Sequence, residues 1–228
     1  MRESSRIAAL TGILVSLTAC GARPATPLTI AAADGDLRSI DGLLASGVPA
    51  DEMGRDGLTP LMWAARKGRT EAMTRLLDAG AAIDGRDLHY HGWTPLLHAI
   101  HKGETAAAHL LIERGADINA PANNGLTPLI AAAAGCDCDS PGGEKALEEI
   151  FFELLGKGAD PRAEMSNHTN ALANAVAAGR TVIVRALLAK APDLRISDTL
   201  EGRASFLLAR LMGRAEIVAM IRNAKAGS

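Results

Sequence analysis

The sequence predicts an all-α solenoid, a stack of about six helix-turn-helix units joined by hairpin-like loops. The main observation is a Thr-Pro-Leu triplet that starts at residues 26, 59, 94 and 127, so that successive copies lie 33, 35 and 33 residues apart. A fixed period of this length is typical of solenoids, in which neighbouring units bury each other's apolar faces. The composition agrees, because 48% apolar but only 3% aromatic residues suit closely packed helices better than a sheet sandwich.

The chain begins with a predicted signal peptide at residues 1–19. Arg2 and Arg6 supply positive charge, and residues 7–17 form an apolar stretch that is too short to span a bilayer. The next residues, Leu17-Thr18-Ala19-Cys20, resemble the lipobox of bacterial lipoproteins. That resemblance implies cleavage before Cys20, a lipid on its thiol and a short tether over residues 20–25. The alternative is an ordinary secretory signal with a chance cysteine near its end.

The lipoprotein resemblance also predicts a location. Several acyl chains on one residue give lasting anchorage to a membrane. In enteric-type sorting an aspartate after the cysteine retains the protein at the inner membrane, whereas here Gly21 follows. We therefore expect the protein on the periplasmic side of the bacterial envelope, at the outer membrane rather than the inner one.

Each residue type of the repeat has a structural role. Proline after threonine fits the first turn of a helix, and the threonine oxygen can cap that helix. A glycine nine residues after the threonine, such as Gly68, ends the first helix. A leucine pair in the second helix, such as Leu76-Leu77, is expected to fill the layer between units. A second glycine, such as Gly80, starts the extended excursion to the next unit.

This pattern resembles the ankyrin-repeat family, whose unit contains Thr-Pro-Leu, a glycine between two helices and a leucine pair before a second glycine. The resemblance covers residues 26 to about 222 and implies a domain over 26–225. Its expected units lie near 26–57, 58–92, 93–125, 126–168, 169–202 and 203–225.

The later units depart from the pattern. Ten residues are inserted within the stretch from Gly135 to Glu144, after which helical spacing resumes. The fifth unit has Asn170-Ala171-Leu172 in place of Thr-Pro-Leu, and the sixth has Ala204-Ser205-Phe206. Atypical terminal units are expected, because they cap the stack.

The family resemblance also implies where a protein partner binds, namely the hairpin tips and the outer positions of the first helices. The hairpin positions are Arg55, Asp56, Leu58, Tyr90, His91, Trp93, Asn123, Asn124 and Leu126. The helix positions in the centre of this strip are Arg66, Lys67, His101 and Lys102. Clustered aromatic and basic residues are typical of interface centres.

The hairpin before Thr94 is two residues longer than its neighbours, so we expect its tip to project and to expose Tyr90 and Trp93. The alternative is that Trp93 folds back against its own hairpin. Trp63 lies within a first helix, where packing is the simpler interpretation.

The insertion contains Cys136 and Cys138, for which three interpretations stay open. They can form a local or intermolecular disulfide in an oxidising compartment, remain inert thiols, or take part in a metal or redox site. A Cys-x-Cys pair supplies only two ligands where zinc takes four, so no metal site is predicted.

The sequence predicts a binding protein without catalytic activity or a cofactor. A formal net charge of -2 argues against general attraction to nucleic acid, and no catalytic or phosphate-binding motif is present. We expect a monomer that binds another protein, as an inhibitor or immunity protein or as an accessory in envelope stress defence. The alternatives are a thiol or metal-binding protein centred on the two cysteines of the insertion, and a structural envelope scaffold.

Overall fold

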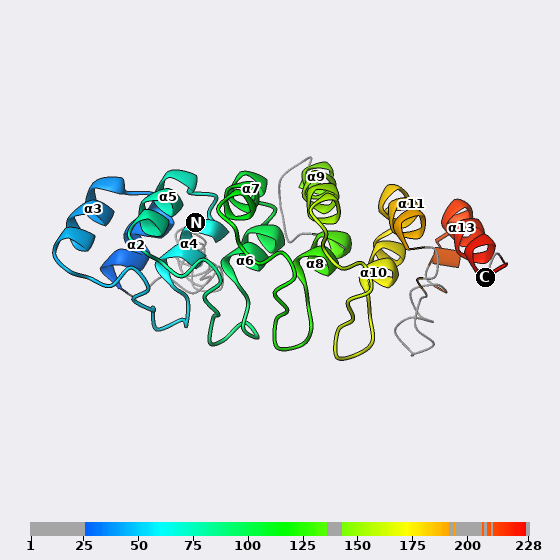
Figure 1. Ribbon diagram of the computed structural model, residues 1–228, viewed down its shortest axis with the longest axis horizontal. Coiled ribbons are helices and arrows are strands. Elements are labelled where there is room, and N and C mark those ends of the chain that lie inside the picture. The colour runs from blue at the N-terminus through cyan, green and yellow to red at the C-terminus, as the bar shows by residue number, and fades with distance from the viewer. Residues whose placement is uncertain are drawn as a thin grey trace, which may run out of the picture.

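The computed structural model describes residues 26–135, 143–191, 194, 207, 209–210 and 212–226, which form eleven helices stacked along one axis (Figure 1). The first helices of the units are α2 (Pro27–Asp34), α4 (Pro60–Arg66), α6 (Pro95–Lys102), α8 (Pro128–Ala134) and α10 (Ala171–Ala178). The second helices are α3 (Leu37–Ala45), α5 (Thr70–Asp78), α7 (Thr105–Glu113), α9 (Gly143–Gly156), α11 (Thr181–Lys190) and α13 (Ala215–Ala226). The predicted all-α solenoid is confirmed.

The first helices begin where the sequence predicts. Thr59 lies at the N-cap of α4, where its hydroxyl accepts from the Met62 amide, and Pro60 occupies the first turn. The other three threonines of the repeat cap their helices in the same way. Asn170 caps α10 with its side-chain oxygen, so the fifth unit keeps the cap although it lacks threonine and proline.

The core runs continuously through the stack between the two rows of helices. Alanines such as Ala64 and Ala65 of α4 are fully buried, which lets neighbouring first helices approach closely. Leu76 is fully buried in the layer between units, while Leu77 packs half-buried at its edge. The two leucines of the repeat are therefore not equivalent, and Leu76 is the core residue.

The loops are hairpins that extend on the side of the first helices (Figure 1). The backbone hydrogen bond that closes the base of the hairpin runs from the Gly54 amide to the Leu58 carbonyl in the second hairpin and from the Ala122 amide to the Leu126 carbonyl in the fourth. The third hairpin closes from Asp87 to Trp93, which confirms that it is two residues longer. Single backbone hydrogen bonds also join the third hairpin to both neighbours, from Leu88 to Gly57 and from Asn123 to His91.

The predicted insertion lies between α8 and α9. Part of it lengthens α9, which has 14 residues against 9 in α7. Cys136 and Cys138 lie outside the described residues, as do the predicted signal peptide, the lipidation site Cys20 and the tether. Along the described ranges, none of the helices combines the length and apolar character that a membrane span requires.

Candidate functional site

The third hairpin is built differently from its neighbours. In the second, Asp56 Oδ1 accepts from the Leu58 amide at 3.1 Å, and in the fourth, Asn124 Oδ1 accepts from the Leu126 amide at 3.1 Å. Such turns need a short polar side chain three residues before the helix cap. His91 occupies that position in the third hairpin. The Trp93 amide donates instead to Asp87, which lies on the other arm of the hairpin.

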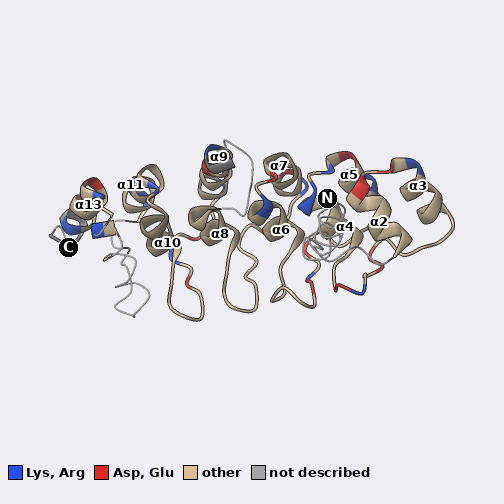
Figure 2. Ribbon diagram, turned by 180° about the vertical axis from the view of Figure 1, so that it is seen from behind, with Lys and Arg blue, Asp and Glu red and all other residues tan. Residues whose placement is uncertain are grey.

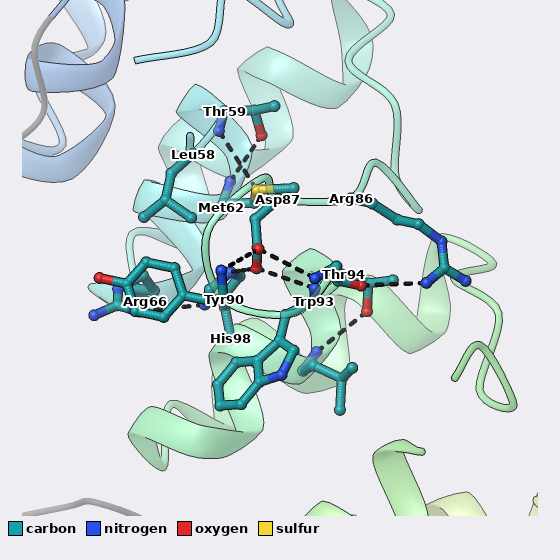
Figure 3. Close-up of polar contacts among 12 residues, drawn as sticks. Leu58, Thr59, Met62, Arg66, Arg86, Asp87, Tyr90, Trp93, Thr94 and His98 are labelled. Carbon is teal, nitrogen blue, oxygen red and sulfur yellow. Dashed lines mark hydrogen bonds and ion pairs between the residues drawn. The ribbon is translucent and has the colours of Figure 1, made fainter. Parts of the chain in front are cut away.

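Asp87 organises the whole third hairpin (Figure 3). Its carboxylate accepts from the amides of Tyr90 at 2.6 Å, Gly92 at 3.3 Å and Trp93 at 3.0 Å. It also lies 2.9 Å from His98 Nε2, and both side chains are fully buried. Burial alone would raise the pKa of Asp87, but the hydrogen bonds from His98 and the hairpin amides outweigh it and hold the pKa below its usual value. Asp87 is therefore ionised.

His98 connects Asp87 to Arg66. Burial is the largest influence on the His98 imidazole and lowers its pKa, and the nearby positive charge of Arg66 acts in the same direction. The ring is therefore neutral at physiological pH. Its Nδ1 atom lies 3.2 Å from Arg66 Nη1. The chain Asp87–His98–Arg66 links the third hairpin, α6 and α4.

Two aromatic rings lie against the Arg66 guanidinium. Its central carbon lies 5.1 Å from the centre of the Tyr90 ring and 5.6 Å from that of Trp63. Tyr90 also meets the edge of the His98 ring, with ring centres 5.6 Å apart. Trp63 is buried, and its Nε1 donates to Asp56 Oδ2 at 2.7 Å. This tryptophan therefore has a packing role, which agrees with the simpler interpretation of its place in a first helix.

Tyr90 and Trp93 are half-buried, so the prediction that the long hairpin exposes both rings is wrong. Tyr90 packs over a small apolar cluster with Leu58, Met62 and Trp63, apart from the main core. Trp93 lies against His98 and against His101, whose ring centre is 4.9 Å away. The extra residues let the hairpin fold back over α4, because that covers aromatic surface which would otherwise face water.

The predicted contact residues divide by exposure. Arg55, Lys67, His91 and Asn123 are exposed, whereas Asp56, Arg66, Tyr90, Trp93, His101, Lys102, Asn124 and Leu126 are partly buried. Leu58 is fully buried beneath the hairpins, so its assignment as a contact residue is wrong. Its place directly before the Thr59 cap directs the side chain into the small apolar cluster.

Three residues of this region were not predicted. Leu88 is 69% exposed at the tip of the third hairpin, the largest exposure among the exposed large apolar side chains of the described residues. Asp87, which precedes Leu88 in the chain, and His98 form the buried pair. One signal in the sequence could have indicated His98. It stands four residues after Thr94, which is the position that Trp63 occupies relative to Thr59 in the preceding unit.

Charged residues of both signs occur along the solenoid, and basic residue types gather at the ends of two first helices. Figure 2 shows Lys and Arg interspersed with Asp and Glu along the solenoid. Basic residue types stand at equivalent positions of adjacent units, namely Arg66 and Lys67 at the end of α4, and His101 and Lys102 at the end of α6. Within the part of the chain that the structure describes, no three His, Cys, Asp or Glu side chains gather as a metal site would require.

Comparison with known proteins gives one positive finding. A family model described as ankyrin repeats in three copies matches residues 6–87, 28–122 and 86–139, which together span more than half of the chain. No curated protein matches the sequence.

Proposed function

Since the chain belongs to the ankyrin-repeat family, we propose that it is a non-catalytic protein that binds another protein through its third hairpin and the adjoining ends of α4 and α6. The observation that carries this proposal is the buried Asp87–His98 pair, which fixes one hairpin in place beneath an exposed apolar tip. A solenoid needs no such pair to close a hairpin, because its second and fourth hairpins close without one.

Rigidity favours binding at this place. Asp87 holds three amides of the hairpin, and backbone hydrogen bonds fix the hairpin to both neighbours. A surface that is already ordered loses less conformational entropy when a partner binds. Arg66, Tyr90 and Trp93 are also of the residue types that carry most binding energy in interface centres.

The proposed setting is the periplasmic side of the bacterial envelope, with the protein held at the outer membrane by a lipid on Cys20. This part of the proposal rests on the lipobox resemblance of Leu17-Thr18-Ala19-Cys20. The protein acts there as a monomer. Its partner is either a toxin or enzyme that it neutralises, or a component of envelope stress defence that it assists.

The test is photo-crosslinking in intact cells. A photoreactive amino acid replaces Leu88 in one variant and Val182 in a matched control, because Val182 is an exposed apolar residue on α11, in the other row of helices. We expect a discrete crosslinked protein with the probe at Leu88 and none with the probe at Val182. Equal capture at both positions, or capture at Val182 alone, would refute the proposed surface.

The identity of the captured protein separates the remaining roles. A toxin or hydrolase indicates an inhibitor or immunity protein, and a peroxide-detoxifying protein indicates stress defence. Binding that is lost when Cys136 and Cys138 are replaced by serine would instead indicate a thiol or metal function. Regular self-assembly in light scattering would indicate a structural scaffold.

A further inference from the structure

We propose that Arg66 is a preset binding residue for an aspartate or glutamate side chain in an acidic segment of the partner, and that His98 and Asp87 are positioning residues that hold its guanidinium. This inference rests on the proposed function and specifies the chemistry of the partner. It is carried by the contacts of Arg66, by the geometry of the buried pair and by the charges at the adjacent helix ends.

Arg66 differs from other arginines of the stack in what it contacts, since some of these pair with carboxylates and others, such as Arg86 and Arg214, donate to backbone carbonyls. Arg75 pairs with Asp41 at 3.5 Å, and Arg114 pairs with Asp78 at 2.9 Å. Among the described residues, no carboxylate lies within ion-pair distance of Arg66, whose contacts are the His98 nitrogen and two aromatic faces. A guanidinium has five N–H donors in a planar fork, so one hydrogen bond to His98 leaves an edge that can donate to both oxygens of a carboxylate.

The aromatic rings and His98 fix where that edge lies. The guanidinium carbon lies over the Tyr90 and Trp63 rings, which restricts the movement of the group, and the bond to His98 sets its direction. An arginine restricted in this way loses little side-chain entropy on binding a carboxylate. Lysine at the same position has no planar group to stack and cannot make the paired hydrogen bonds.

Asp87 determines which nitrogen of His98 carries the proton. An ionised carboxylate only accepts, so His98 Nε2 must donate to Asp87. In a neutral ring this leaves a lone pair on Nδ1, which accepts from Arg66 Nη1. With the proton on Nδ1 instead, two donors would face each other and the guanidinium would be displaced. The Asp87 carboxylate in the third hairpin thereby sets the position of Arg66 on α4 through His98 on α6.

The neighbouring charges favour an acidic segment over a single chain-terminal carboxylate. Lys67 follows Arg66, and His101 and Lys102 occupy the equivalent positions one unit further along. Arg66 and Lys67 thus present two adjacent positive charges, which favour a segment with more than one carboxylate. Asp56, the carboxylate that holds Trp63, is already engaged by the indole and by the Leu58 amide.

The first experiment measures binding of a capped oligoglutamate peptide to the full chain by fluorescence anisotropy, with a capped oligoglutamine peptide as the control probe. We expect binding of the glutamate peptide alone. Arg66→Lys keeps the charge and should weaken this binding by about tenfold or more, since it removes the paired hydrogen bonds. Lys67→Gln removes an adjacent charge and should weaken it by about twofold, chiefly at low salt.

The second experiment tests the positioning chain. Asp87→Asn should move the His98 proton from Nε2 to Nδ1, visible in nitrogen NMR, and should weaken peptide binding as Arg66→Lys does. If this variant does not fold, two substitutions of His98 test the same role. Glutamine supplies one donor and one acceptor, so His98→Gln should retain most of the affinity that His98→Leu loses.

Each part of the inference has its own contrary result. Equal affinity of wild type and Arg66→Lys, equal losses in Arg66→Lys and Lys67→Gln, or no preference for glutamate over glutamine would overturn the carboxylate site. Unchanged affinity in Asp87→Asn, or equal affinity of the Gln and Leu variants at His98, would overturn the positioning role. A partner captured at Leu88 whose binding ignores Arg66→Lys would leave the proposed function standing and this inference wrong. If peptide binding depends on Arg66 but no partner is captured at Leu88, this inference would stand and the proposed function would be wrong.

Discussion

Replacing Asp87 with alanine should destabilise the protein by about 3–5 kcal/mol, the range for removing one partner of a buried charged pair. The magnitude follows from four donors that lose their acceptor, namely the amides of Tyr90, Gly92 and Trp93 and the His98 Nε2. Gly92 and His98 are buried. Each of these two should contribute about 1–3 kcal/mol, the penalty of an unsatisfied buried donor.

The matched control is Asp84→Ala. Asp84 is exposed and accepts from one amide, that of Asp117 at 3.0 Å, so its loss should cost about 1 kcal/mol or less. Urea unfolding followed by circular dichroism gives the two changes in stability. Amide hydrogen exchange adds the location, because a local loss of about 3 kcal/mol should speed exchange at Tyr90 and Trp93 by about a hundredfold.

The reasoning would be refuted if Asp87→Ala and Asp84→Ala differed by less than about 1 kcal/mol while exchange at Tyr90 and Trp93 stayed slow. The amides of the third hairpin would then have other acceptors, and Asp87 would not organise the loop. A large loss of stability with unchanged local exchange would also contradict the local origin of the effect.

The remaining predictions concern pH, packing and anchoring. Because the folded-state pKa of His98 is depressed, the unfolded chain takes up a proton that the folded protein excludes, so stability should fall as pH drops below the unfolded value of 6.5. His98→Gln should flatten that part of the curve, and an unchanged slope would contradict it. Leu76→Ala should cost about 2–5 kcal/mol and Leu77→Ala clearly less, because only Leu76 is fully buried; comparable losses in urea unfolding would argue against the assigned core. Trp63→Phe should cost about 1 kcal/mol more than Trp93→Phe in the same assay, since the Trp63 indole donates to Asp56 whereas the buried Nε1 of Trp93 has no hydrogen-bond partner among the described residues. Cys20→Ser should abolish fatty-acid labelling and membrane fractionation, and persistent labelling would disprove lipid attachment at this residue.

The solenoid was predictable because its determinants are local and repeated. Thr59 caps the helix that begins at the next residue, and Pro60 fits the first turn of that helix whatever surrounds it. The same residue types recur every 33 or 35 residues along the first four units, so the period alone indicates the stack. The two extra residues of the third hairpin could be counted from the sequence for the same reason.

The candidate site was predictable in its position and not in its arrangement. Family resemblance indicated Arg66, Tyr90 and Trp93, but their spacing says nothing of where the side chains point. His98 meets Asp87 eleven residues before it and Arg66 thirty-two residues before it, across three elements. Only the stacking of α6 on α4 brings these three groups together.

The same distinction explains the two errors. Sequence position placed Leu58 and the aromatic rings of the third hairpin at an exposed edge, because hairpin tips of a solenoid normally face solvent. The fold buries Leu58 and half-buries Tyr90, since covering apolar surface against α4 is more favourable than hydrating it. Backbone turns and caps depend on a few neighbouring residues, so the sequence determines them. The direction of a side chain between two units depends on the packing of both units, so only the tertiary structure determines it.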